Sequence, residues 1–119
     1  MNKFLKKERL SSKIDIEELF KSKNTFTQDK IKVYWNQNSS NTEKVSVLFS
    51  VPKKIVSLAT KRNKIKRLLK ESYRINKKIL QKTDKEIHIA FVYLSTETPN
   101  FNTIEEKIKL ILQRLNDQI

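Results

Sequence analysis

The chain has 119 residues, of which 37% are hydrophobic and 33% charged, and this length and composition fit one folded domain covering residues 1–119. The absence of Cys excludes disulfides and thiolate metal sites, a single His excludes an all-imidazole metal site, and the absence of Gly excludes glycine-rich phosphate loops. A formal net charge of +13 indicates a polyanionic partner, with nucleic acid as the first candidate.

The first predicted element is a short helix near the N-terminus. The stretch before it, "MNKFLKKERL", interrupts its apolar residues with charge and does not resemble a signal peptide, and no segment approaches the ~20 apolar residues of a membrane span. We therefore expect a cytoplasmic protein with no membrane partner. In "SSKIDIEELFKSKN", Ser12 can cap a helix on which Ile16, Leu19 and Phe20 share one face.

Two runs with an alternating pattern then predict strands. In "KIKVYWN", Ile31, Val33 and Trp35 fall on one side of a half-buried strand, and Lys32 and Tyr34 fall on the other. Tyr34 is thereby predicted to face away from the core.

The second alternating run, "KVSVLFSV", ends before Pro52 because proline cannot donate to a strand ladder. The polar run "NQNSSNTEK" between the two runs is typical of a turn, so we predict that they form an antiparallel hairpin with a long loop. One more short strand is predicted at residues 25–28.

The C-terminal part adds one strand and one helix. "IHIAFVYL" is rich in β-branched and aromatic residues, which favours a buried strand, and "TDKE" separates it from the preceding helix. Thr103 with Glu106 three residues later is a capping box that predicts the start of the last helix. The apolar stripe of that helix comprises Ile104, Ile108, Ile111, Leu112 and Leu115.

The order of these elements predicts the fold class. The predicted order is helix, strand, strand, helix, strand and helix, with the additional short strand. This order indicates a two-layer α/β (α+β) sandwich in which the helices cover one face of a single, mostly antiparallel sheet. Trp35, Phe49 and Phe91 are assigned to the core, and His88 is predicted to be structural or exposed rather than functional.

Residues 59–80 have a helical period with two contrasting sides. One side is a core-facing stripe of Ile65, Leu68, Leu69, Ile75, Ile79 and Leu80. The opposite arc of roughly 120° carries Lys66, Lys77, Lys70, Asn63, Arg74, Arg67 and Lys78. Glu71 is the only acid among nine bases from Lys61 to Lys78, whereas an ordinary solvated face intersperses both signs. A nucleic-acid surface is therefore favoured, and membrane-surface binding is disfavoured because the stripe is aliphatic without bulky aromatic residues.

The basic segment also carries a family motif. "KKIVSLATKRNKIKRLLKESYR" resembles the protein component of bacterial ribonuclease P, whose signature of Arg-Asn, two residues and Lys-Arg is matched by Arg62, Asn63, Lys66 and Arg67. Positions that fit around the motif are Lys53, Lys54, Ala59, Glu71 and Arg74. The family's opening helix is similar to "RLSSKIDIEELFK", its first strand to "KVYW", and the strand before the motif to "VSVLFSVPKK". The resemblance therefore covers residues 9–78 well and the remainder in pattern.

The resemblance implies a ribonucleoprotein in which a large RNA removes the 5′ leader of precursor tRNA by hydrolysis that depends on Mg²⁺, held mainly by the RNA. The protein would be a non-catalytic subunit that pairs 1:1 with ribonuclease P RNA and also binds precursor tRNA. A left-handed βαβ crossover at the basic helix is implied too, against the right-handed default. The residues agree with a protein that does not cut, because one His, no Cys and no clustered carboxylates offer little for catalytic metals.

Two binding surfaces are implied by the resemblance. The basic helix would bind the RNA subunit through Lys53, Lys54, Lys61, Arg62, Asn63, Lys64, Lys66, Arg67, Lys70 and Arg74. The central cleft of the sheet would bind the single-stranded leader through Phe20, Lys32 and Tyr34, since aromatic rings stack on unpaired bases. Phe20 could equally be a core residue. Lys64 stands where the family usually has Arg, and Ile16 where it usually has an aromatic residue.

Two other functions stay open on the residues alone. A plain RNA-binding module, such as a ribosome-associated protein, would bind with the same steep salt dependence but without preference for a 5′ leader. A self-contained nuclease would cleave without an RNA subunit, but the chain lacks a constellation of residues for that chemistry.

Overall fold

The computed structural model describes residues 9–38, 45–80 and 86–119. Its elements follow the predicted order, with the additional short strand at 25–28 present. They are α1 (Lys13–Phe20), β1 (Thr25–Gln28), β2 (Ile31–Asn38), β3 (Val45–Ser50), α2 (Ala59–Asn76), the 3₁₀ turn η2 (Lys77–Ile79), β4 (Glu86–Tyr93) and α3 (Phe101–Gln118). The predicted turn at 36–44 overlaps the end of β2 and otherwise lies outside the described residues, as does most of "TDKE" at 83–86.

Local sequence signals account for α1 and β2. The Ser12 side chain caps α1 by accepting a hydrogen bond from the Asp15 amide. In β2 the three residues predicted to face the core are buried, and Lys32 and Tyr34 on the other side are half exposed. The period-2 pattern therefore correctly predicted which way the residues from Ile31 to Trp35 face.

The turn between β1 and β2 has two residues, Asp29 and Lys30, with φ angles of 43° and 71°. Positive φ at both positions suits the twist of a two-residue hairpin, and it is adopted here without glycine. Contacts with other elements hold the turn, because Asp29 pairs with Lys107 of α3 at 3.5 Å and the Leu94 amide donates to the Lys30 carbonyl at 2.8 Å.

The four strands form one sheet in the order β1-β2-β4-β3. β2 pairs antiparallel with β1 and β4, and β3 pairs parallel with β4, so the sheet is mostly antiparallel as predicted.

The predicted hairpin between β2 and β3 is wrong, because β4 lies between them. All residues of β4 from Ile87 to Tyr93 are buried. β4 is a central strand of the sheet, and this position buries both of its faces. Alternation along β2 and β3 shows which way residues face, but not which strand they pair with.

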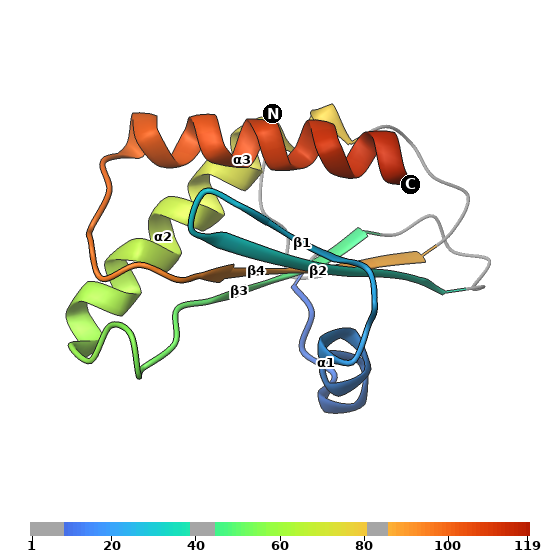
Figure 1. Ribbon diagram of the computed structural model, residues 1–119, viewed down its shortest axis with the longest axis horizontal. Helices are drawn as coiled ribbons and strands as arrows, with labels where there is room; N and C mark the ends of the chain where they lie inside the picture. Colours follow the sequence, from blue (N-terminus) through green and yellow to red (C-terminus); the bar gives the residue numbers. More distant parts are fainter. Residues whose placement is uncertain (1–8, 39–44, 81–85) are drawn as a thin grey trace.

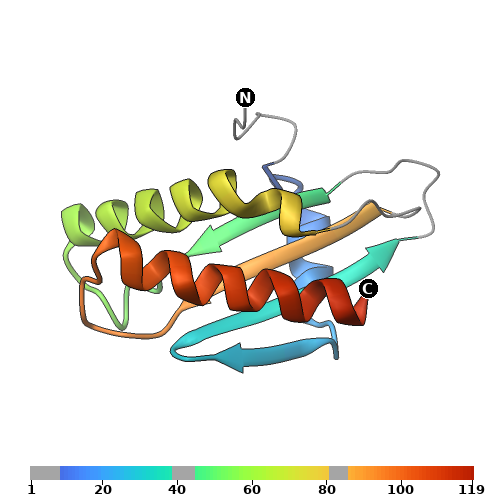
Figure 2. The same cartoon turned by 90° about the horizontal axis from the view of Figure 1, so that it is seen from above.

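The chain passes from β3 through α2 to β4, which lies next to β3 and parallel to it. Figure 2 shows that this crossover is left-handed: with α2 in front of the sheet and the two strands pointing up, β4 would lie to the left of β3. The implied handedness is thus confirmed, against the strong right-handed preference of such units.

The helices lie on both faces of the sheet (Figure 1). α2 and α3 cover one face over the main core, and α1 packs on the opposite face in a smaller cluster built on Leu10, Leu19 and Ala90. The prediction that all helices cover one face is therefore wrong. Because both sides of β4 are buried, a single layer of helices would leave one of them in water.

The apolar side of α2 differs in part from the predicted stripe. Ile65 and Leu69 are fully buried, but Ile75 is 39% exposed and Tyr73 takes a core position. The helix ends at Asn76, so its period does not continue into η2 as predicted, although Ile79 and Leu80 still pack against the core.

Two polar residues, Ser72 and Asn76, are buried where α2 meets α3. Ser72 donates to the Leu68 carbonyl at 2.8 Å. Asn76 Nδ2 donates to the Ser72 carbonyl at 2.8 Å and to Glu105 Oε2 of α3 at 3.1 Å. These hydrogen bonds offset the cost of burying polar groups, and they join the basic helix to the C-terminal helix.

The start of α3 lies earlier than predicted. Asn100 is the N-cap, and its side chain accepts a hydrogen bond from the Thr103 amide at 2.8 Å. The predicted capping box at Thr103 and Glu106 is therefore wrong, because Thr103 is already in the first turn of the helix. The predicted apolar stripe is confirmed, since all five of its residues are fully buried.

Replacing the cap residue is expected to reveal this boundary in solution. Asn100→Ala should lower the free energy of unfolding by about 1 kcal/mol, because the first-turn amide loses its acceptor. Thr103→Ala is the matched control and should cost less, since only the Thr103 backbone takes part in the cap. Urea unfolding monitored by circular dichroism measures both, and a larger loss for Thr103→Ala would contradict the assignment.

Candidate nucleic-acid interfaces

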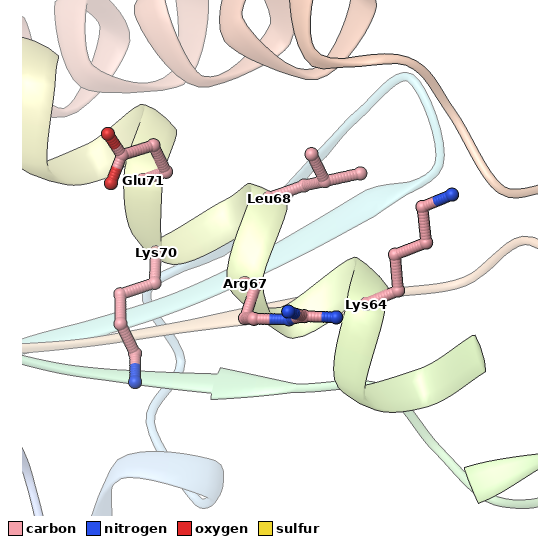
Figure 3. A pocket seen from close by; sticks show the side chains of 5 residues that line it. All are labelled: Lys64, Arg67, Leu68, Lys70 and Glu71. Atoms are coloured by element: carbon pink, nitrogen blue, oxygen red, sulfur yellow. The ribbon is translucent and has the colours of Figure 1, made fainter. Parts of the chain in front are cut away.

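The solvent side of α2 carries a surface of one charge sign. We define the basic face as Asn63, Lys64, Lys66, Arg67, Lys70 and Arg74, which are all exposed or half exposed. The burial of Ile65 and Leu69 under the helix turns these residues outward. Lys64, Arg67 and Lys70 line a shallow hollow of about 480 Å³ together with Leu68 and Glu71. Figure 3 shows the side chains of Lys70 and Glu71 leaving α2 on opposite sides.

Glu71, the one acid of α2, pairs with Arg74 one turn later. The Arg74 guanidinium donates from Nε to Glu71 Oε2 at 2.9 Å and from Nη2 to the other carboxylate oxygen. The hydrogen bond from Arg74 holds the pKa of Glu71 below its ordinary value, and the same contact raises the pKa of Arg74. The fork orients Arg74 along the helix surface and offsets part of its charge.

This pair predicts a small dependence of stability on pH. Because the pKa of Glu71 is lowered by folding, its contribution is complete above the ordinary pKa of 4.5 and is lost as the pH falls through the folded value. Both groups are partly exposed, so solvent screening keeps this loss of stability small. Urea unfolding of wild type and Glu71→Gln should differ at pH 7 and converge at acid pH; a difference that grows as the pH falls would contradict the sign.

Two of the predicted docking residues have structural contacts at the start of α2. Arg62 Nη1 donates to the carbonyls of Val56 and Ser57 at 3.0 and 2.7 Å, and Lys61 Nζ donates to the Thr96 carbonyl after β4. These contacts fix the segment that enters the helix. Lys53 and Lys54 are exposed in the turn that precedes this segment, so they lie near the N-terminal end of the basic face.

The three predicted leader-binding residues lie together on the α1 side of the sheet. The rings of Phe20 and Tyr34 meet edge to face, with centroids 4.9 Å apart and planes at 70°. Lys32 Nζ lies 4.9 Å from the centroid of the Tyr34 ring. We call Phe20, Lys32 and Tyr34 the aromatic cluster. Phe20 is 39% exposed, which excludes the alternative that it is a core residue.

Several residues outside the two surfaces are buried or partly buried in the protein interior. Trp35 and Phe91 are buried in the main core as predicted, and Phe49 is half buried against it. Ile16, which stands where the family usually has an aromatic residue, packs partly buried beside Leu19 on the α1 side. His88 is only 2% exposed, so it is a structural residue of β4.

The basic face is on α2 and the aromatic cluster includes the last residue of α1, and these two helices lie on opposite sides of the sheet (Figure 1). β3 is an edge strand between them, and the chain before α1 runs beside it, with the Leu10 amide donating to the Val47 carbonyl at 2.9 Å. This contact brings Arg9 to the edge of β3, near Lys66 and Lys70. Sequence pattern did not single out Arg9, because its position depends on a bridge to a residue 38 positions away.

In residues 9–38, 45–80 and 86–119, no three His, Asp or Glu side chains lie close enough together to hold a metal ion. Within the same ranges, no helix has the length and apolar character needed to span a bilayer.

Comparison with known proteins agrees with this arrangement. The sequence model of the family described as Ribonuclease P matches residues 4–116. The ribonuclease P protein component of Porphyromonas gingivalis is 35% identical over 115 residues, which cover 92% of this chain and 84% of that protein. The corresponding protein of Clostridioides difficile is 30% identical over 106 residues, covering 88% of this chain and 89% of that protein. The solved ribonuclease P protein of Thermotoga maritima is 27% identical and superposes with a TM-score of 0.72, covering 90% of this chain and 96% of that one. With nearly its whole length matched, the chain belongs to the ribonuclease P protein family.

Proposed function

We propose that this ribonuclease P protein component is a non-catalytic subunit that binds ribonuclease P RNA with the basic face of α2 and the 5′ leader of precursor tRNA with the aromatic cluster. It would pair 1:1 with the RNA, which removes the leader using Mg²⁺ held mainly by the RNA itself. The observation that carries the proposal is the presence of two chemically different surfaces on opposite sides of one sheet.

The composition of the basic face supports its docking to a folded RNA. The charged groups of lysine and arginine neutralise phosphates and release the counterions bound to them. Binding of this kind is strong and depends on salt, but it does not depend on the base sequence of the RNA. The side chains project from a helix whose opposite side is anchored in the core by Ile65 and Leu69. A rigid helix can present several cations at once to the closely spaced phosphates of a large RNA.

The aromatic cluster suits a single strand of variable sequence. Exposed aromatic rings bind unpaired bases by stacking, which depends little on base identity. Lys32 lies beside the Tyr34 ring, where its ammonium group could contact the phosphate of a stacked nucleotide. Leaders differ among precursor tRNAs, so stacking with one nearby cation provides binding without a fixed sequence.

A non-catalytic role is supported by the position of the one histidine. His88 is buried in β4, and its Nε2 lies 3.6 Å from Glu86 Oε1 within the sheet. A general base has to reach the proton it abstracts, and a side chain that is 2% exposed does not reach a solvent-borne phosphodiester. We therefore propose that the RNA supplies the reacting groups and the Mg²⁺.

Reconstitution with a bacterial ribonuclease P RNA at low Mg²⁺ tests the proposal. Added protein should stimulate leader removal and tighten binding of precursor tRNA over mature tRNA, while protein without RNA should not cleave. Cleavage by the protein alone would contradict the non-catalytic role. Salt-dependent RNA binding with no preference for precursor tRNA would instead favour a plain RNA-binding module.

A further inference from the structure

A second hollow lies at the outer edge of β3. It has a volume of about 300 Å³, which is at the lower limit of small-ligand sites, commonly about 300–1,000 Å³. We call it the β3-edge groove, and its lining residues are Arg9, Val47, Leu48, Phe49, Lys66 and Lys70. Three of the six are cations, three are apolar and none is acidic. This combination suits a ligand with an anionic part and a flat apolar part.

The apolar part of the groove has a rigid aromatic residue. Phe49 is half buried, and its ring stacks on Phe91 with centroids 5.4 Å apart and an interplanar angle of 14°. Tyr73 of α2 meets the same ring at 6.0 Å in an edge-to-face arrangement. With its position set from inside the core, Phe49 offers a preorganised apolar surface at the groove, and little conformational freedom would be lost on binding.

The cationic part comes from two separate segments. Lys66 and Lys70 are one turn apart on α2 and belong to the basic face. Arg9 reaches the groove because its backbone forms a parallel bridge with Val47 of β3. Cations from two separate segments that line one small hollow can contact one phosphate together.

We propose that the β3-edge groove binds one unpaired nucleotide of ribonuclease P RNA, with its base against Phe49 and its phosphate among Arg9, Lys66 and Lys70. The inference rests on the proposed function, because it extends the RNA-docking surface beyond α2. An RNA-subunit nucleotide is favoured over the leader because Lys66 and Lys70 are part of the basic face, and Val47 and Phe49 pack toward the α2 side of the sheet, away from the aromatic cluster.

Site-directed cross-linking tests which RNA occupies the groove. The chain has no Cys, so Arg9→Cys carries a unique position for an aryl-azide reagent, and Gln113→Cys on the exposed side of α3 is the matched control. At saturating protein, the probe at position 9 should label one unpaired nucleotide of the RNA subunit, and the control should not. Labelling of the leader, scattered labelling of helices, or no labelling would each overturn the proposal.

A thermodynamic cycle then tests the stacking contact. Phe49→Leu should weaken binding of the RNA subunit about tenfold, and the same variant should have no further effect on RNA that lacks the base at the labelled nucleotide. Equal losses on intact and abasic RNA would overturn the stacking contact. If Phe49→Leu does not fold, wild-type protein must still lose about tenfold in affinity for the abasic RNA.

A charge variant completes the test. Arg9→Gln should reduce the slope of log affinity against log salt by about 1, while Lys13→Gln, an equal loss of charge on α1, should leave it close to wild type. Equal effects of the two variants would overturn the groove. If wild-type protein fails to stimulate leader removal, the proposed function itself fails; if it succeeds and the groove variants behave as wild type, only this inference fails.

Discussion

The double variant Lys64→Ala/Arg67→Ala is expected to bind ribonuclease P RNA about 10²- to 10⁴-fold more weakly than wild type at low salt, since two charge-assisted hydrogen bonds of about 1.5–3 kcal/mol each are lost. Both side chains are exposed on the basic face and line the hollow seen in Figure 3. The slope of log affinity against log salt should fall by about 2, one for each phosphate contact. Filter binding at several salt concentrations measures both quantities.

The effect should be confined to binding. Neither side chain is in the core, so the free energy of unfolding should change by less than about 0.5 kcal/mol. Lys13→Ala/Lys109→Ala removes the same charge from exposed positions on α1 and α3 and is the matched control. If the control variant loses as much affinity, net charge rather than the basic face determines binding, and the proposed docking surface is wrong.

Leader-dependent binding should fall about tenfold in Tyr34→Leu, because base–aromatic stacking is worth about 1–3 kcal/mol. Leucine keeps apolar volume against the cluster of Leu10, Leu19 and Ala90 but removes the aromatic face. Tyr34→Phe retains that face and should bind as wild type. The measurement is the affinity of the reconstituted complex for tRNA precursors with and without a leader.

Leaderless substrate separates a leader contact from a general defect. Tyr34→Leu should bind tRNA without a leader as wild type does, because the aromatic cluster lies on the opposite side of the sheet from the basic face. An equal loss on both substrates would mean that the substitution disturbs the packing of α1 or the fold. Unchanged binding to both would remove Tyr34 from the proposed leader site.

The local features of the fold were predictable because they depend on neighbours in sequence. Alternation placed Tyr34 on the side opposite Trp35, and the Ser12 cap marked the start of α1. The predicted α3 start at Thr103 failed for a related reason. Asn100 and Thr103 both resemble N-caps, and only the backbone conformation shows that Asn100 precedes the first turn.

The interior of α2 was less predictable, because burial of polar residues depends on distant partners. The hydrophobic pattern predicted that Ile75 is buried, but Ile75 is exposed, and the polar residues Ser72 and Asn76 are buried instead. Their burial is acceptable because hydrogen bonds satisfy them, including one from Asn76 to Glu105, 29 positions away in the sequence. Periodicity alone cannot identify a partner at that separation.

By itself, the sequence determined that α2 has an apolar side and a side of one charge sign, and its Arg-Asn and Lys-Arg pairs identified the family resemblance. Only the tertiary structure decided that α1 lies on the opposite face from α2, that β4 separates β2 from β3, and that Phe20 meets Tyr34. The physical reason is that a helical or strand period specifies which way a side chain points, whereas its neighbours depend on how all apolar faces are buried together. Both faces of β4 had to be covered, and covering the second one with α1 brought the aromatic cluster together.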